Sequence, residues 1–385
     1  MDKRIERSAF IFLLLLPVIH GVAYISLLLL FFWAIRSHKV KYIPLKPYVY
    51  VLLGTVVLSC ILSTNKLISL GALVVFLCYL LSFVVFANLK KSDLLSEDKL
   101  ITAIVLSGII ITVIGIVQYF TKTTSVIDYK CLKISPYSST LGNANRFAKY
   151  LVLVTPIGVA SLLSIRTLKL KMLSFIFIPL AFLSLWITQS VAGMGATLIT
   201  ILIVLWVKNK WSTIIIITCV IGICGMNYKK VRGFTVHNTC PEIRINTWKY
   251  LVPEIIKSYP ITGCGLGTYK ETAKKYYEDK RFLRIHAHNM YANYVCETGI
   301  LGLIAFLSFL WGFFYYSIKS FKAHKNNWLQ LGGISAIVGL LIHGMVETCI
   351  DYLPIGLMFF TIMGIVVGAG GDDHSSQERQ DLIQK

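Results

Sequence analysis

Long apolar runs separated by short polar connections extend along almost the whole chain. The runs cover residues 8–19, 21–35, 47–63, 67–88, 100–120, 146–164, 172–188, 191–207, 212–228, 291–317, 327–346 and 352–369. An apolar stretch of about 20 residues is long enough for a helix to cross a bilayer, and strand-type alternation is absent from the runs. The pattern therefore predicts an all-α polytopic membrane protein with about 12 transmembrane helices.

The first two runs are too short for two straight crossings. Residues 8–35 correspond to about 42 Å of helix, which cannot cross a ~30 Å apolar layer twice without distortion. Pro17, His20 and Gly21 lie where the two runs meet. Because proline interrupts helices, we expect a break at this point.

Basic residues are concentrated in alternate short connections. Residues 36–46, 90–99, 166–171, 208–210 and 319–325 are rich in Lys and Arg, whereas residues 63–66, 188–190 and 347–351 carry a single Lys between them. The positive-inside rule places the first set in the cytoplasm. Twelve short or tilted helices with both termini cytoplasmic fit every loop, and 11 helices with an external N-terminus are the alternative.

The composition supports a protein that lies mostly in the membrane. Hydrophobic residues make up 56% of the chain and charged residues only 15%, which excludes a soluble domain with a single anchor. The nine cysteines show no CxxC pair or other metal spacing, and a disulfide among Cys131, Cys240 and Cys264 is left open. We expect no metal and no cofactor, since phosphate-binding glycine loops and carboxylate clusters are lacking.

Two long external segments divide the chain. We predict N-terminal transmembrane helices over residues 1–228, interrupted by an external segment at 122–145, a large basic loop at 229–290, C-terminal helices at 291–370 and a cytoplasmic tail at 371–385. Between Lys229 and Arg284 the loop holds 12 Lys and Arg against five Asp and Glu, a net charge of +7. This excess suits an anionic substrate such as a diphosphate, or contact with anionic lipid headgroups.

The large loop contains two ordered signals. An amphipathic helix is expected to begin at Arg244 and to end at Ser258–Pro260, with Trp248 and the following apolar residues on one face. Gly263, Gly265 and Gly267 then form a tight turn. This turn either cradles an anion with its amides or folds back on the membrane surface.

A histidine pair follows at the mouth of the next apolar run. His286 and His288 are separated by Ala287 and precede Asn289. An imidazole at a bilayer edge is costly unless it is used. The pair indicates an enzyme that acts on a membrane-embedded substrate.

Several segments resemble the O-antigen ligase/polymerase superfamily. They are His288-Asn289 followed after nine residues by Gly299, Arg244-x-x-x-Trp248, P-I-T-G-C-G-L-G-T-Y at Pro260–Tyr269, E-T-G-I-L-G at Glu297–Gly302, and G-N-A-N-R-F-A-K-Y-L at Gly142–Leu151. The resemblance covers roughly residues 140 to 355, and the segments occur in the family's order.

The resemblance implies a metal-independent inverting glycosyltransferase with a GT-C-like multi-helix architecture, in the bacterial inner membrane with its active site facing the periplasm. Such enzymes move a glycan from an undecaprenyl diphosphate carrier to a sugar hydroxyl. The implied partners are that glycan donor, a lipid A core or glycan acceptor and membrane lipids, with no nucleic acid. We favour a ligase, with a polymerase or a protein O-oligosaccharyltransferase as alternatives. A polyprenyl-linked glycan transporter is the alternative of another class, although we find no internal repeat.

Site residues follow from the same resemblance together with the chemistry of each side chain. We predict His288 as general base, with Asn289 holding its orientation. The candidates for binding diphosphate or sugar are Arg244, Arg146, His286, Trp248, Arg284 and Asn145, with Arg232 as a further cation. The alternatives are a headgroup-contacting histidine, a surface ion pair for Arg244 and an interfacial aromatic for Trp248.

The sequence departs from the family pattern at one position, and it has an acidic pair in its last short connection. Val191 stands where the family usually has an arginine that is assigned to the diphosphate. Arg146, Lys149 or the large loop would then supply the charge; otherwise this member handles its donor differently or is inactive. Glu347 and Asp351 either hold the loop arginines or bind acceptor hydroxyls, but we interpret them as ordinary residues of a short external loop.

Overall fold

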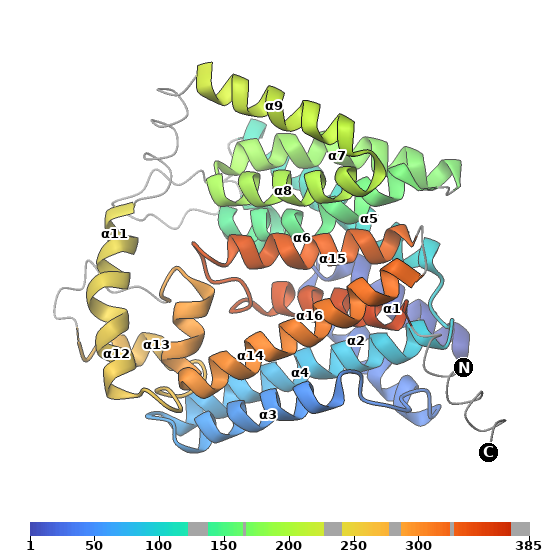
Figure 1. Ribbon diagram of the computed structural model, residues 1–385. Coiled ribbons are helices and arrows are strands. Elements are labelled where there is room, and N and C mark those ends of the chain that lie inside the picture. Colours follow the sequence, from blue (N-terminus) through green and yellow to red (C-terminus); the bar gives the residue numbers. More distant parts are fainter. Residues whose placement is uncertain (122–137, 165–166, 227–240, 277–285, 324–326, 371–385) are drawn as a thin grey trace.

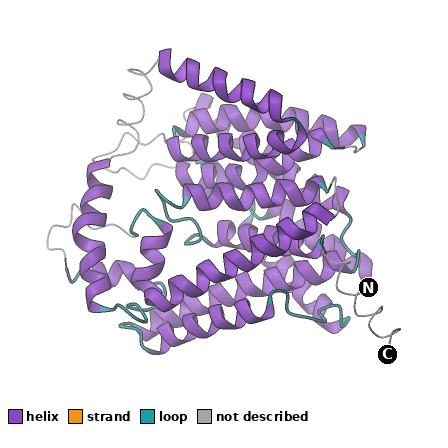
Figure 2. Ribbon diagram, viewed as in Figure 1, coloured by secondary structure: helices purple, strands orange, loops and turns teal. Residues whose placement is uncertain are grey.

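The computed structural model describes residues 1–121, 138–164, 167–226, 241–276, 286–323 and 327–370. Over these residues it is all-helical, without a strand (Figure 2). The elements are α1 (Asp2–Leu15), α2 (His20–Arg36), α3 (Lys46–Ile61), α4 (Lys66–Lys91), α5 (Glu97–Thr121), η1 (Ser139–Leu141), α6 (Ala144–Leu163), α7 (Leu168–Thr188), α8 (Val191–Lys208), α9 (Lys210–Met226), α11 (Pro241–Asn246), η2 (Thr247–Leu251), α12 (Val252–Ser258), α13 (Tyr269–Ala273), α14 (Met290–Ala323), α15 (Trp328–His343) and α16 (Leu353–Gly368).

Six of the described helices are long and apolar enough to cross a membrane, namely α4, α5, α6, α7, α8 and α14. Five shorter apolar helices, α2, α3, α9, α15 and α16, accompany them. Large apolar side chains such as Leu67, Phe120 and Trp211 are exposed on the outside of the bundle, as a bilayer-facing surface requires. The prediction of an all-helical, multi-pass membrane protein is confirmed.

The first apolar stretch is broken where the sequence predicts it. Helix α1 ends at Leu15 and α2 begins at His20, so the break contains Pro17. The two helices pack against each other. The carbonyl of Pro17 is not left unpaired, because it accepts a hydrogen bond from the Thr140 hydroxyl of η1.

Helices α6 and α16 form the interior of the bundle. α6 packs against α15, α7 and α8, and α16 packs against α4. In α6, 83% of the apolar stretch is buried inside the protein, and nearly every residue of α16 is buried. Both helices are therefore surrounded by other helices rather than by lipid.

The segments after α9 gather at one end of the bundle. Figure 1 shows α11, α12 and α13 beside the beginning of α14, at the end of the molecule opposite to the start of α1. The expected amphipathic face is confirmed: Leu251, Val252 and Ile255 are buried, and Trp248 and Ile256 pack against them. The helical segment ends at Ser258, as the sequence predicts.

The three-glycine turn folds back onto a break in α14. Gly299 has a non-helical backbone (φ 67°, ψ −174°) that interrupts α14, and Gly263 also has a positive φ. The Cys264 N–H donates to Cys296 O at 2.9 Å, and the Gly265 N–H donates to Glu297 O at 2.9 Å. A Cβ atom on Gly299 would lie 2.1 Å from Ile261 O, so this close backbone approach requires glycine.

The side chain of Glu297 occupies the inside of the same turn. Its Oε1 accepts a hydrogen bond from the Tyr269 N–H at 3.3 Å. A backbone N–H at the end of the turn therefore binds a carboxylate of the protein itself. Among the described residues the glycine turn packs against α14, and its contact with an external anion or with the membrane surface stays a prediction. Cys264 is a buried free thiol, whereas Cys131 and Cys240 lie outside the described residues.

Candidate active site

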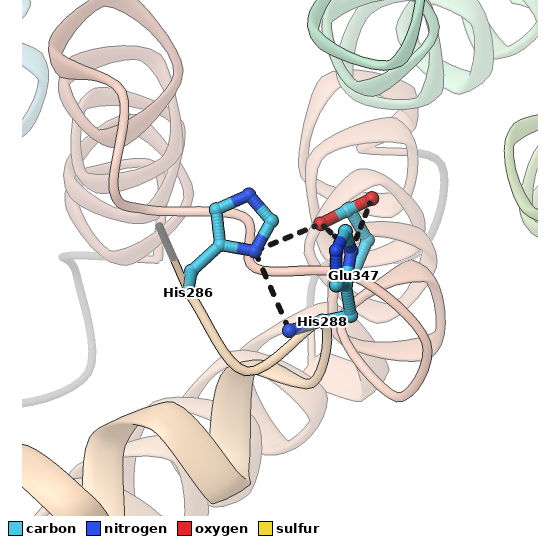
Figure 3. Close-up of side chains that lie close together, drawn as sticks. All are labelled: His286, His288 and Glu347. Atoms are coloured by element: carbon cyan, nitrogen blue, oxygen red, sulfur yellow. Dashed lines mark hydrogen bonds and ion pairs between the residues drawn. The ribbon is translucent and has the colours of Figure 1, made fainter. Parts of the chain in front are cut away.

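The buried carboxylate of Glu347 is the centre of a polar cluster between α6, α14 and α15. Its Oε1 and Oε2 lie 3.1 and 3.3 Å from His288 Nδ1, and Oε1 lies 3.4 Å from His286 Nδ1. Its Oε2 accepts a hydrogen bond from Asn145 Nδ2 at 3.2 Å and lies 3.7 Å from Arg244 Nη2. Figure 3 shows the side chains of His286 and His288 next to this carboxylate.

Two hydrogen bonds join the start of α14 to the end of α15. The Met290 N–H donates to Gly344 O at 2.7 Å, and Asn289 Nδ2 donates to Met345 O at 2.8 Å. The other end of the Asn289 amide accepts from the Ala292 N–H at 2.9 Å, which caps α14. Because His288 precedes these residues at the start of α14 and Glu347 follows those at the end of α15, the two bonds hold His288 next to Glu347.

The short segment before α14 is held in a fixed shape. Trp248 Nε1 donates to Ala287 O at 2.8 Å, and the Ala287 N–H donates to Asn293 Oδ1 at 3.1 Å. His288 itself has a left-handed backbone, with φ 53°, which is uncommon for a residue other than glycine. As a result the two imidazole rings meet edge to face, with centroids 4.5 Å apart.

The charges around Glu347 favour its ionised form. Burial by itself raises the pKa of a carboxyl, but the hydrogen bond from His288 and the charge of Lys149 hold the pKa of Glu347 well below its usual range. Burial lowers the pKa of His286, and the nearby Glu347 opposes this effect. Glu347 is therefore an anion that orients and stabilises its neighbours.

A second ion pair lies next to the first. Lys149, buried in α6, donates to Thr348 O and lies 3.8 Å from Asp351 Oδ1. The Arg146 guanidinium lies over the Tyr352 ring, 4.1 Å from its centroid. Two cations of α6 thus stand at the edge of the site.

The donor atoms of His286, His288 and Glu347 all lie within 4.8 Å of one another, a spacing that suits a metal ion. From the sequence we expect no metal, and this expectation stays a prediction.

Residues 140–307 match the family model described as O-Antigen ligase. The chain carries an O-antigen ligase domain. The resemblance to the O-antigen ligase/polymerase superfamily is therefore confirmed. No curated protein matches the chain.

The O-antigen ligase domain contains all of the predicted site residues. The structure brings His286, His288, Arg244 and Asn145 together around Glu347. Asn289 and Trp248 bind backbone carbonyls beside them. Arg146 lies at the edge, and the predicted Arg284 and Arg232 lie outside the described residues.

The interpretation of Glu347 as an ordinary loop residue is wrong. Its side chain is only 4% exposed and pairs with three of the predicted site residues. Glu347 also lies beyond the end of the O-antigen ligase domain at residue 307. The signal in the sequence was an acidic residue close after His343, on a face where the other charges are basic.

Arg244 is not a surface residue either. Its side chain is 16% exposed and its guanidinium faces Glu347, so an ion pair on an exposed helix surface does not describe it.

Within the O-antigen ligase domain, Val191, which stands where the family usually has an arginine, is the first residue of α8. It follows Ser190, whose hydroxyl caps the helix. Which cation replaces the family arginine stays open.

Proposed function

We propose that the protein is an O-antigen ligase-type glycosyltransferase. It transfers a glycan from undecaprenyl diphosphate to a sugar hydroxyl of lipid A core at the periplasmic face of the bacterial inner membrane. The observation that carries the proposal is the pair formed by His288 Nδ1 and the buried carboxylate of Glu347, 3.1 Å apart. The O-antigen ligase domain supports the reaction class.

The pair suits a general base. When the Nδ1–H of His288 donates to Glu347, the lone pair of the neutral ring is on Nε2. The imidazole side chain is 20% exposed, so an acceptor hydroxyl can approach it. Nε2 then takes the hydroxyl proton, and the anionic Glu347 stabilises the resulting imidazolium.

The transfer is a single displacement with inversion. The acceptor oxygen forms a bond to the anomeric carbon of the donor sugar as the bond from that carbon to the diphosphate oxygen breaks. The proton goes to His288, and the electron pair leaves with the diphosphate. Developing charge on the leaving group needs cations more than protons, and arginine side chains are proposed to supply them without a metal.

Arg244 is the proposed diphosphate ligand, with Arg146 and Arg284 as further cations. Nη2 of Arg244 lies 3.7 Å from Glu347 Oε2, and a guanidinium has five N–H donors. The remaining donors are available for a bidentate contact with an oxyanion. His286 is proposed to bind the acceptor, and Asn145 and Asn289 to hold Glu347 and His288 in place.

The test is a transfer assay with purified protein in detergent, a synthetic undecaprenyl diphosphate glycan and EDTA, with or without lipid A core. Product on lipid A core that is lost in His288→Ala supports the ligase. Longer polyprenyl-linked chains without lipid A would instead mean a polymerase. Donor binding without turnover on lipid A core, glycan or peptide acceptors would contradict an enzyme and favour a transporter.

A further inference from the structure

Three nitrogen and oxygen donors converge at the candidate active site. His286 Nδ1 and His288 Nδ1 lie 3.4 and 3.1 Å from Glu347 Oε1, and all the donor atoms lie within 4.8 Å of one another. Tetrahedral Zn²⁺ with bonds of about 2.0–2.1 Å places its ligand atoms roughly 3.3 Å apart. The observed spacing therefore needs only small shifts to hold such an ion.

A metal ion would reach the cluster from the side of the two imidazoles, because these are its more exposed groups. The carboxylate is 4% exposed, whereas the side chains of His286 and His288 are 24% and 20% exposed. An ion that enters between the rings would meet the buried carboxylate behind them and keep a fourth position for water. Figure 3 shows the three side chains close together, with a ring nitrogen of His286 directed toward the carboxylate.

Nδ1 of His286 cannot suit both of its neighbours at the same time, whichever tautomer the ring adopts. Its Nδ1 faces the His288 backbone N–H at 3.4 Å and Glu347 Oε1 at 3.4 Å. With a lone pair, Nδ1 accepts from the N–H but faces an anion. With a proton, it donates to Glu347 but opposes the N–H. A cation bound by the lone pair and by the carboxylate removes this conflict with the anion.

We propose that His286, His288 and Glu347 form a Zn²⁺ site whose occupation inhibits the enzyme. The inhibitory part rests on the proposed function, whereas the binding part does not. Zn²⁺ on Nδ1 of His288 displaces the proton that this nitrogen donates to Glu347. A neutral imidazole bound through Nδ1 carries its hydrogen on Nε2. Nε2 then has no lone pair to accept a proton from the acceptor hydroxyl.

Neighbouring cations limit the affinity of this site. Arg244 Nη2 lies 3.7 Å from the same carboxylate, and Lys149 is close enough to lower its pKa. Both oppose a divalent cation. Removal of the Arg244 charge should therefore tighten Zn²⁺ binding several-fold, a direction that an ion bound elsewhere would not show.

Binding is tested on the full-length protein in detergent after removal of bound metal. Titration with ZnCl₂ by calorimetry, and with CoCl₂ by visible absorption, should give one ion per chain in a nitrogen and oxygen environment. His286→Ala and Glu347→Gln should each weaken binding by at least about 10-fold, since even outer partners of metal ligands have effects of this size. His20→Ala, outside the cluster, is the matched control and should bind normally. Equal affinity in wild type, His286→Ala and Glu347→Gln would overturn the site.

Inhibition is tested in the transfer assay with added ZnCl₂. The expected result is loss of transfer with the same apparent affinity as in the binding titration, full recovery with EDTA, and no effect of MgCl₂. Normal transfer at saturating Zn²⁺ would overturn the inhibition, and so would loss of transfer in EDTA. If the proposed function itself fails, the binding titrations still decide whether the site exists.

Discussion

Asn145 donates from Nδ2 to Glu347 Oε2 at 3.2 Å, and this bond joins the beginning of α6 to the connection between α15 and α16. Asn143 caps the same end of α6 by accepting from the Asn145 and Arg146 N–H groups. The G-N-A-N segment therefore has two tasks, because one asparagine starts the helix and the other holds the carboxylate. The site depends on a helix start far from His288 in the sequence.

Glu347→Gln should impair transfer while the protein still folds. The amide keeps the shape of the carboxylate but cannot stabilise an imidazolium, so we expect kcat to fall by about 10²–10⁴-fold, the range of general acid–base catalysis. The rate of transfer under donor saturation is the measurement. Asp351→Asn, at an exposed carboxylate that pairs with Lys149, is the matched control and should have a much smaller effect.

Arg244→Lys should raise the KM for the polyprenyl diphosphate donor, by on the order of 10-fold. Lysine keeps the positive charge but loses the planar pair of donors that a diphosphate accepts. The measurement is the dependence of the transfer rate on donor concentration. A silent Arg244→Lys variant would mean that Arg244 only balances the charge of Glu347.

Trp248→Phe separates two roles of the indole. Phenylalanine keeps an aromatic face but loses the Nε1–H bond to Ala287 O. If the bond positions the histidine segment, kcat should fall by about 10-fold, within the roughly 1–2 kcal/mol of one hydrogen bond. If the indole instead stacks on a sugar, kcat of the Trp248→Phe variant should be near normal. The Trp248→Ala variant should then bind substrate more weakly.

Gly299→Ala should destabilise the protein by at least about 2 kcal/mol, since the new Cβ meets Ile261 O at a backbone of positive φ. Gly195→Ala in α8 is the control, because a Cβ there has nothing within 4 Å. Thermal unfolding in detergent compares the two. Equal midpoints would contradict the packing of the glycine turn against the break in α14.

Stability should decline as the pH falls below about 6.5, because burial lowers the pKa of His286 from its ordinary value of 6.5. The unfolded chain then binds a proton that the folded protein does not, so stability increases with pH across this range and decreases on acidification. His286→Gln removes this contribution and should flatten the profile between pH 6.5 and about 4, the range over which the pKa of His286 is lowered. An unchanged slope in the variant would assign the effect to other groups.

The elements were predictable from sequence where local patterns decide them. Proline and glycine determine the break between α1 and α2, and the spacing of Trp248, Leu251 and Ile255 determines the buried face of η2 and α12. Histidine at a helix mouth likewise indicated the site, because the cost of burying an imidazole is a local property.

Glu347 was not predictable in the same way. Its role depends on His288, 59 residues away, and on Asn145, 202 residues away. In the sequence it belongs to a short polar connection between apolar runs, and such connections usually lie in water. Only the packing of α6, α14 and α15 makes that position buried. The glycine turn was undecided for a similar reason, since its partner is the break in α14.

The position of Glu347 beyond residue 307 affects how hybrid enzymes should be built from this protein. A chimera that exchanges only residues 140–307 would take His288 from one parent and its carboxylate from the other. Asn145 and Arg244 would move with the histidine, while the connection between α15 and α16 stayed behind. Exchanges of acceptor specificity should therefore place the C-terminal junction after Tyr352, so that His288 travels with its own carboxylate.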